Sequence, residues 1–438
     1  MSMIVVLVGC TTPVAVAPQH AASVDSQLLA EIMKIPAIDD HAHPSKLLAA
    51  GEKDADWDVL SFDGLEGIEV GARLDDDATW IAAAKALYDY PFDDLTPARF
   101  EWISNARAKL IAAHGDDYSA WTLRRLGIET MLANRVALGR GLVAPGFRWV
   151  PFEDALVFPL DNSGLGKQTP DRAAFAPGIT RNAKRMVHEA GYDTLPSSLD
   201  AYLVKVVTPT LERQRRDGAV AIKLELAYLR PLAFSNPSEA DARRVYDKYA
   251  AGGVPPDDDY RLLQDFLVRR IAREAGRLGL PVHIHCAFGP GRYFDDARTT
   301  PFALETLFDD PDLAHTNFVI VHGGWPAVHE TTPLLAKANV WADFSWQPIV
   351  TYARPLSHTL REWLEFMPSK ILFGTDAFPL ADGHWELPAW VANTTARTAL
   401  AMALTEMIGD GEITRARALE LARLVLHDNA AALYKLRP

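Results

Sequence analysis

The stretch from Pro36 to Pro44 reads Pro-Ala-Ile-Asp-Asp-His-Ala-His-Pro, and the interpretation of the whole chain starts from it. His41 and His43 stand two residues apart at the end of an apolar run. On a β-strand this spacing places both side chains on one face, where two imidazoles can bind one divalent cation. Pro44 stops the hydrogen-bonding ladder directly after them. Structural histidines produce the same pattern, so the ends of the later strands decide its meaning.

Apolar runs that alternate with helical patterns predict eight strands along the chain. The predicted strands are Ala37 to His43, Ile128 to Arg135, Phe147 to Leu160, Ala219 to Tyr228, Pro281 to Ala287, Asn317 to His322, Val340 to Ser345 and Lys370 to Asp376. A long helical insertion, residues 45–120, follows the first strand and is expected to lie over the strand ends. This order predicts an α/β fold, a (β/α)8 TIM barrel, with a doubly wound open sheet as the alternative.

Composition narrows the function classes. The chain has 438 residues, 49% of them hydrophobic, which is enough for one large catalytic domain. Its formal charge of −13 and the lack of a basic run argue against nucleic acid or an anionic membrane surface as a partner. A small-molecule substrate is therefore expected, and a homo-oligomer remains open. Cys286 follows a histidine-rich strand and is expected to be a buried free thiol between the sheet and the helices.

The N-terminus has a separate organisation. Leu7-Val8-Gly9-Cys10 resembles a bacterial lipobox, in which Cys10 would be lipidated. Residues 1–27 are then a signal segment and a flexible tether, and residues 28–438 form the barrel. This interpretation predicts a lipoprotein on the periplasmic face of a bacterial membrane, attached only through Cys10. The alternative is an N-terminal extension on a cytoplasmic enzyme.

Polar side chains gather near the ends of the predicted strands, where barrel enzymes carry their chemistry. They are His41 and His43 on the first strand, Lys223 and Glu225 on the fourth, His283 and His285 on the fifth, His322 on the sixth and Asp376 on the eighth. Several imidazoles and a carboxylate suit Zn²⁺ or a neighbouring first-row metal, with room for a water.

In this order, the motifs resemble those of the amidohydrolase superfamily. The resemblance is to its amidohydrolase-related branch (amidohydrolase 2) of metal-dependent hydrolases and decarboxylases. The matching stretches are Ile38 to His43, Ile284 to Cys286, Val319 to Gly324, Ile371 to Asp376 and Asp428 to Tyr434. A narrower likeness, to the nodulin-type amidohydrolase domain, rests on Lys223, on Ala227-Tyr228 and on His285 to Gly289. The chain departs from that group by placing Leu229 between Tyr228 and Arg230.

The resemblance implies a ligand set and a base. His41, His43, His285 and Asp376 would bind one divalent metal, most simply Zn²⁺. His322 would lie near the bound water or the substrate carbonyl. Asp376 would also accept a proton from the water, as a carboxylate at the end of an apolar strand can do.

Lys223 leaves two arrangements open. In part of the superfamily a carboxylated lysine on the fourth strand bridges two metals, so a second metal is expected if Lys223 is carboxylated. Otherwise one metal is bound, and Lys223 pairs with Asp39 or with a substrate carboxylate. Glu225 faces the same side and is a candidate ion-pair partner for it. Asp39 is expected to orient a metal ligand, and His283 to be a deeper histidine below the ligands.

Substrate contacts are predicted from residues at or after the strand ends. Tyr228, Trp325 and Arg230 are the candidates, with Trp346 and Phe378 as further pocket aromatics. Packing and surface salt bridges are the alternatives for these side chains.

Three function classes follow. The leading one is a metal-dependent hydrolase that uses an activated water on an amide, lactone or ester of a small molecule. The second is a non-oxidative decarboxylase of a small carboxylic acid on the same metal site. The third is a binding lipoprotein without catalysis, whose expected sign is a missing ligand.

Overall fold

The computed structural model describes residues 24–49, 52–60, 62, 65, 77–380 and 383–436. Cys10 and the predicted lipobox lie outside these residues, so the lipid anchor stays a prediction. Among the helices in the described ranges, none combines the length and the apolar content needed to cross a bilayer.

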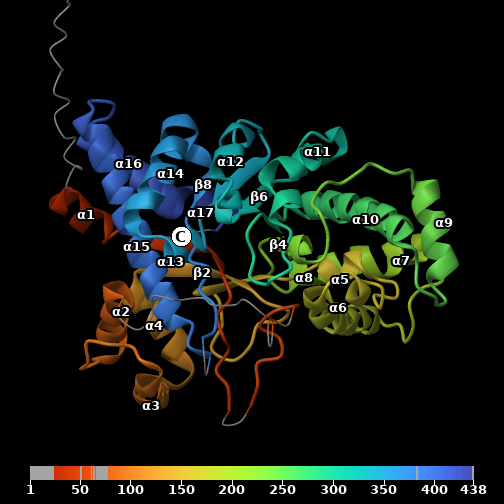
Figure 1. Ribbon diagram of the computed structural model, residues 1–438, viewed down its shortest axis with the longest axis horizontal. Coiled ribbons are helices and arrows are strands. Elements are labelled where there is room, and N and C mark those ends of the chain that lie inside the picture. Colours follow the sequence, from red (N-terminus) through yellow and green to blue (C-terminus); the bar gives the residue numbers. More distant parts are fainter. Residues whose placement is uncertain are drawn as a thin grey trace, which may run out of the picture.

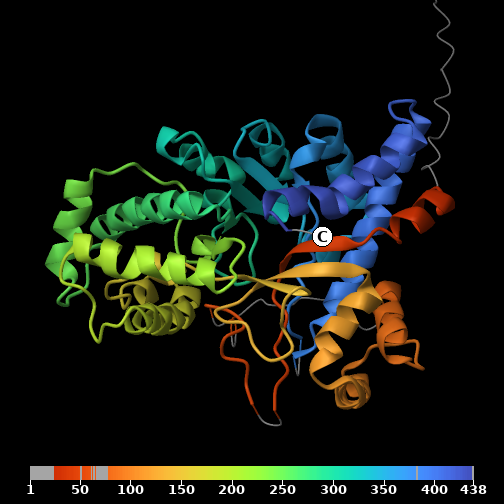
Figure 2. The ribbon, with the colours of Figure 1, turned by 180° about the vertical axis from the view of Figure 1, so that it is seen from behind.

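Eight parallel strands in the described chain form the centre of the molecule (Figure 1). They are β1 (Ala37–Ala42), β2 (Ile128–Asn134), β3 (Phe147–Val150), β4 (Ile222–Leu224), β5 (Val282–His285), β6 (Phe318–Val321), β7 (Val340–Asp343) and β8 (Ile371–Leu372). They pair in sequence order, β1-β2-β3 in one group and β4-β5-β6-β7-β8 in the other. Figure 2 shows β1 lying alongside β2. This is the order that a (β/α)8 barrel requires.

Backbone hydrogen bonds join the last strand to the first. The amide of Asp40 donates to the carbonyl of Phe373 at 2.8 Å, and the amide of Asp376 donates to the carbonyl of His41 at 2.7 Å. These bonds continue past the end of β8 and bring the polar ends of β1 and β8 side by side.

A second set of hydrogen bonds joins β3 to β4. The amide of Val220 donates to the carbonyl of Trp149 at 3.0 Å, and the amide of Lys223 donates to the carbonyl of Pro151 at 2.8 Å. The two strand groups are thus connected at both edges, which a doubly wound open sheet does not allow. The predicted barrel is confirmed.

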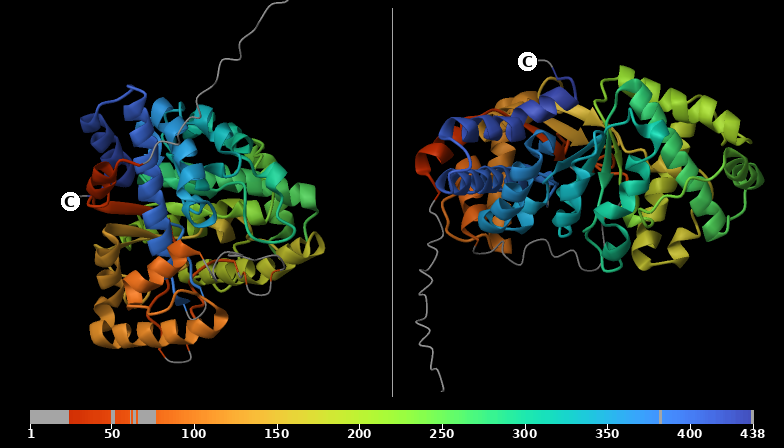
Figure 3. Two further views of the ribbon diagram at one scale, coloured as in Figure 1. Left: turned by 60° about the vertical axis from the view of Figure 1, so that its left-hand side comes forward. Right: turned by 90° about the horizontal axis from the view of Figure 1, so that it is seen from above.

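Helices surround the barrel and cover its ends (Figure 3). They are α1 (Ser26–Ile32), α2 (Ala78–Tyr88), α3 (Pro97–His114), α4 (Tyr118–Leu126), α5 (Asp154–Val157), α6 (Pro170–Glu189), α7 (Leu199–Tyr202), α8 (Thr208–Arg216), α9 (Glu239–Tyr249), α10 (Asp257–Leu278), α11 (Glu305–Phe308), α12 (Val328–Leu334), α13 (Gln347–Val350), α14 (Ala353–Phe366), α15 (Glu386–Gly409), α16 (Arg415–Arg423) and α17 (Asn429–Leu433). The long helix α15 packs against α2 of the insertion after β1.

Three predicted strands are markedly shorter than their apolar runs indicated, and the eighth, expected over Lys370 to Asp376, covers only Ile371–Leu372. The third ends at Val150, and α5 occupies the second half of the predicted segment. The fourth ends at Leu224 and is followed by a 3-10 turn, η4 (Leu226–Tyr228). The backbone amide of Glu225 donates to the carboxylate of Asp154 at 2.7 Å instead of to a neighbouring strand. A continuous apolar run does not reveal such an end, because turn and strand are equally buried here.

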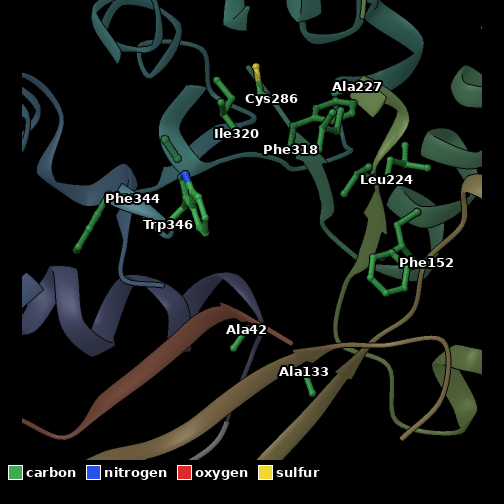
Figure 4. Close-up of a cluster of buried hydrophobic side chains, with 14 of the residues drawn as sticks. Ala42, Ala133, Phe152, Leu224, Ala227, Cys286, Phe318, Ile320, Phe344 and Trp346 are labelled. Atoms are coloured by element: carbon green, nitrogen blue, oxygen red, sulfur yellow. The ribbon is translucent and has the colours of Figure 1, made fainter. Parts of the chain in front are cut away.

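The hydrophobic core has two parts. The larger cluster lies between the strands and the helices and reaches the walls above the strand ends; Figure 4 shows Phe152, Leu224 and Ile320 among its members. Cys286 belongs to this cluster and is fully buried, as predicted. The smaller cluster combines strand residues such as Ile38 with residues at the chain's C-terminal end. Its members are Ile38, Leu132, Val150, Val220, Ala221, Val319, Leu372, Ala430, Leu433 and Tyr434.

Tyr434 adds a polar connection inside this smaller cluster. Its hydroxyl donates to the carboxylate of Asp40, and it lies 2.7 Å from Nε2 of His283. Asp40 and His283 are fully buried. The C-terminal segment therefore supplies a hydrogen-bonding group to polar residues in the lower layer of the barrel.

Replacing Tyr434 by Phe should lower the free energy of unfolding by about 1–3 kcal/mol, because a buried carboxylate loses its donor while the ring remains. Urea unfolding of the purified protein measures this change. Tyr293→Phe is the matched control, since that tyrosine is 43% exposed, and its effect should stay within about 0.5 kcal/mol. Equal stability of Tyr434→Phe and the wild type would contradict the structural role of this hydroxyl.

Candidate metal centre

A register shift in the first strand positions its polar residues. The pairing of β1 with β2 shifts register between Asp39 and Ala42. As a result two consecutive side chains, Asp40 and His41, both reach interior groups: Asp40 accepts from Tyr434, while Nε2 of His41 lies 3.2 Å from Nζ of Lys223. A regular strand would alternate them between faces.

Asp39 connects β1 to the strand that carries Asp376. Its carboxylate accepts from the backbone amide of Thr375 at 2.9 Å and from the Thr375 hydroxyl at 2.6 Å. It also accepts from the amide of His41 at 3.3 Å. Asp39 therefore holds the backbone beside two of the predicted ligands, rather than pairing with Lys223.

Three donor atoms meet at the ends of β1 and β8. Nε2 of His41 lies 3.3 Å from Nε2 of His43 and 3.3 Å from Oδ1 of Asp376, and the third edge, from His43 to Asp376, is 3.4 Å. Tetrahedral Zn²⁺ with bonds of about 2.0–2.1 Å would place its donor atoms roughly 3.3 Å apart. The three atoms thus form a triangle of the size that one face of such a site needs.

His285 and His322 supply a second pair of donors, whose tautomers follow from their partners. Nε2 of His285 lies 3.1 Å from the carbonyl of Phe288, which only accepts, so this nitrogen carries the proton. The Ser345 hydroxyl uses its one proton on Asp343, so Nδ1 of His322, 2.8 Å away, must donate to it. Both remaining nitrogens then carry lone pairs.

These two lone-pair nitrogens, Nδ1 of His285 and Nε2 of His322, lie only 3.2 Å apart. Such a contact is repulsive unless a proton or a cation lies between or beside them. Burial is the main cause that lowers the pKa of both imidazoles well below the usual value, which disfavours an extra proton. The pair therefore fits a cation.

The other two imidazoles have the charge state that a metal needs. Burial and the nearby Lys223 ammonium hold the pKa of His41 well below its usual value, and burial lowers the pKa of His43 to about 3. Burial raises the pKa of Asp376 well above the ordinary value, a shift that an adjacent cation would oppose. Neutral imidazoles with a carboxylate are the ligand forms that bind divalent metals, so these residues fit one.

Lys223 and Glu225 of the β4 segment lie beside this group. Nζ of Lys223, fully buried, is 3.7 Å from Oε1 of Glu225. Glu225 in turn approaches Asp58 and His43, with donor atoms of the three residues within 4.8 Å of one another. Burial raises the pKa of Asp58 to about 7 and that of Glu225 to about 8.

A cavity of about 260 Å³ opens above these residues. It is lined by His43, Trp57, Asp58, Phe62, Glu225, Tyr228, His285, Phe288, Pro290, His322, Trp346, Asp376, Phe378 and Pro379. Tyr228, Trp346 and Phe378 were predicted as pocket residues. Trp57, Asp58 and Phe62 come from the insertion after β1, as its expected place over the strand ends allows, but no periodic pattern in that insertion singles them out.

Three of the candidate site residues lie outside the cavity lining. The Arg230 guanidinium is buried against the Asp265 carboxylate and is not part of the cavity lining, so it is not free to bind an anionic substrate group there. Trp325 packs its ring against Phe288, 5.4 Å between centroids, behind the lining. His283 lies deeper, bonded to Tyr434, as predicted for the lower histidine of its strand.

Arg135, at the end of β2, anchors the insertion that contributes to the cavity. It donates to the carbonyl of Pro44 at 2.7 Å and forms a two-pronged ion pair with Asp54, at 2.8 and 3.0 Å. Both side chains are at least nine-tenths buried. This attachment holds the chain just before Trp57 and Asp58 against the barrel rim.

Comparison with known proteins agrees with the family resemblance of the sequence motifs. A sequence model of the amidohydrolase family matches residues 176–436. The protein fluG of Emericella nidulans is 25% identical over 232 residues, which cover 50% of this chain and 26% of that protein. The chain thus corresponds to about a quarter of that relative.

Solved structures share the fold at low identity. Uronate isomerase from Thermotoga maritima aligns with a TM-score of 0.64 and 16% identity, over 96% of this chain and 99% of that one. Glucuronate isomerase from Caulobacter crescentus aligns with a TM-score of 0.61 and 16% identity, over 94% of each chain. These likenesses show the barrel. With the family model matching more than half of its length, the chain belongs to the amidohydrolase family.

Proposed function

We propose that this protein is a metal-dependent hydrolase that cleaves an amide, lactone or ester of a small molecule. The observation that carries the proposal is the triangle of donor atoms from His41, His43 and Asp376, with edges of 3.3–3.4 Å, at the floor of an aromatic cavity. The lone pairs of His285 and His322 that face each other support it, because they also call for a cation.

The same residues would hold the metal, with Zn²⁺ as the ion that suits their donors best. A divalent metal bound there supplies a water of lowered pKa and a Lewis acid for a carbonyl oxygen. The protein's own contribution is to orient the donors: Asp39 holds the strand segment before Asp376, and Ser345 fixes the ring of His322.

Asp376 is suited to move the proton. Its Oδ1 belongs to the donor triangle, whereas its Oδ2 faces His322 at 3.9 Å. One oxygen can therefore stay with the donors while the other accepts a proton from the attacking water and passes it to the leaving group. Because Nε2 of His322 is unprotonated, it offers a lone pair to a metal and cannot donate a hydrogen bond to a substrate carbonyl.

The cavity lining favours hydrolysis over reactions of anionic acids. Within the described part of the chain, no lysine or arginine is among the residues that line it. Two of the structural neighbours are named as isomerases of uronates, which are sugar acids. A uronate substrate would bring a carboxylate that needs a lysine or arginine as its partner, and so would an acid that undergoes decarboxylation. An uncharged acyl group fits this lining better. The complete donor set also argues against a non-catalytic binding protein.

The donor triangle predicts the metal content. The purified protein should carry about one equivalent of Zn²⁺ or a similar ion, and the double replacement His41→Ala, His43→Ala should reduce it at least about tenfold, because two of the converging donors are lost. Elemental analysis by mass spectrometry measures this.

The matched control is His329→Ala with His358→Ala, two exposed histidines. Stoichiometric metal in the first double mutant would exclude the proposed ligands; two equivalents that fall to one in Lys223→Met would favour the bridged site.

The proposed base predicts a loss of turnover that metal loss does not explain. Asp376→Asn keeps an oxygen near the donors but removes the proton acceptor, so kcat on a cleaved amide or ester should fall by about 10²- to 10⁴-fold. The comparison is made at equal bound metal, with the exposed Asp312→Asn as control. Near-normal turnover in a metal-replete Asp376→Asn protein would exclude the role.

A further inference from the structure

A second polar group lies in the same cavity, on the far side of His43 from the donor triangle. Nε2 of His43 is 3.4 Å from Asp376, while its Nδ1 is 3.3 Å from Oδ2 of Asp58. Glu225 completes this second group. The width of one imidazole ring therefore separates it from the site proposed for the metal.

The carboxyl groups of this second site need a partner that the described residues do not fully supply. Asp58 and Glu225 are only 4% and 3% exposed. Oε1 of Glu225 lies 3.7 Å from Nζ of Lys223, and its Oε2 has no donor within the described chain other than the neighbouring Asp58 carboxyl group, which can donate only while it is protonated. Buried carboxyl oxygens are rarely left without a donor, and two adjacent carboxylates repel each other unless a cation or a proton lies between them.

Aromatic rings surround the same end of the cavity. The ring of Trp57 lies 6.2 Å from that of His43 and 6.0 Å from that of Phe62, which in turn lies 5.3 Å from the ring of Tyr228. Aromatic faces attract organic cations through their quadrupole, and ammonium groups are commonly recognised by rings and carboxylates together. This environment suits an organic ammonium group better than a hydrated metal ion.

A second part of the cavity lining is apolar. Phe288 and Trp346 stack with 6.1 Å between centroids, and Phe378 follows at 5.9 Å from Trp346. A cavity of about 260 Å³ with this lining accommodates a molecule with one ring rather than an oligomer.

We propose that the substrate carries a protonated amino group, which binds between Asp58 and Glu225, on an apolar body with a single ring. The amino group lies close to the scissile acyl group, because only the His43 ring separates the two subsites. This inference rests on the proposed hydrolase function and adds the substrate class to it: amides or esters of small apolar amino compounds.

Binding of three ligands of equal size tests the charge preference without any substitution. Benzylamine, benzyl alcohol and benzoate are titrated into the metal-loaded, full-length protein and followed by calorimetry and by the intrinsic tryptophan fluorescence, to which Trp57 and Trp346 of the cavity contribute. A charged hydrogen bond contributes about 1.5–3 kcal/mol, so benzylamine should bind at least about tenfold tighter than benzyl alcohol, and benzoate should bind most weakly. Equal binding of the amine and the alcohol would overturn the proposal.

Variants test the location. Glu225→Gln and Asp58→Asn should each weaken benzylamine binding about tenfold or more, while binding of benzyl alcohol changes little. Asp56→Asn is the matched control, because Asp56 lies on the same insertion but pairs with Arg185 outside the cavity lining. Unchanged benzylamine binding in Glu225→Gln would overturn the assignment.

Metal content separates this proposal from the hydrolase proposal. Glu225→Gln should retain its metal; loss of one equivalent from a protein that held two would identify the group as a second metal site instead and overturn the amine assignment. A protein that binds metal and cleaves phenylalanine amide no faster than 3-phenylpropanamide remains a hydrolase without the amino preference. A protein that binds benzylamine as proposed but holds no metal has the subsite and lacks the hydrolase function.

Discussion

The contact between the first and the last strand of the barrel is the interaction on which the site depends. His41 and Asp376 are separated by more than three hundred residues in the sequence, yet the amide of Asp376 donates directly to the carbonyl of His41. Asp39 strengthens this junction through both donors of Thr375. Because donor atoms from both strands must stay about 3.3 Å apart to share a metal, any opening of this junction would separate them.

This junction also explains how the barrel tolerates several charged groups in its interior. Asp39, Asp40, Lys223 and Asp343 are fully buried, and an isolated buried charge is strongly unfavourable. Asp39 and Asp40 accept from the distant Thr375 and the C-terminal Tyr434, and Asp343 accepts from the amide of His322 and from nearby Ser345. Lys223 lies between an imidazole and a carboxylate. The polar layer is therefore held in place by closure of the barrel, and it in turn limits how the ligands move.

The sequence predicts the barrel, and it places the candidate donor residues near strand ends, because both depend on local patterns. Apolar runs mark all eight strands, and His41, His43, His322 and Asp376 each stand at the end of one. What it does not reveal depends on irregular backbone or on long-range contacts. The register shift that brings Asp40 and His41 to the interior has no sequence signal. Asp58 and Trp57 belong to an aperiodic insertion, and Ser345 gains its role only through the neighbouring sixth strand. The position of Arg230 after a strand predicts a place in the cavity, but its guanidinium pairs with Asp265 on α10, outside the cavity lining.

The regular strand ends and the aperiodic insertion contribute different parts of the site. The strand ends position the donor atoms, because the backbone on both sides is hydrogen-bonded, and the barrel that carries them is the fold shared with the uronate isomerase and the glucuronate isomerase. The insertion after β1 is attached by the buried Arg135–Asp54 pair and by a backbone hydrogen bond from the amide of Val136 to the carbonyl of Asp56, and it supplies Trp57, Asp58 and Phe62. In the proposed function, the insertion supplies substrate contacts and the barrel supplies the donor atoms.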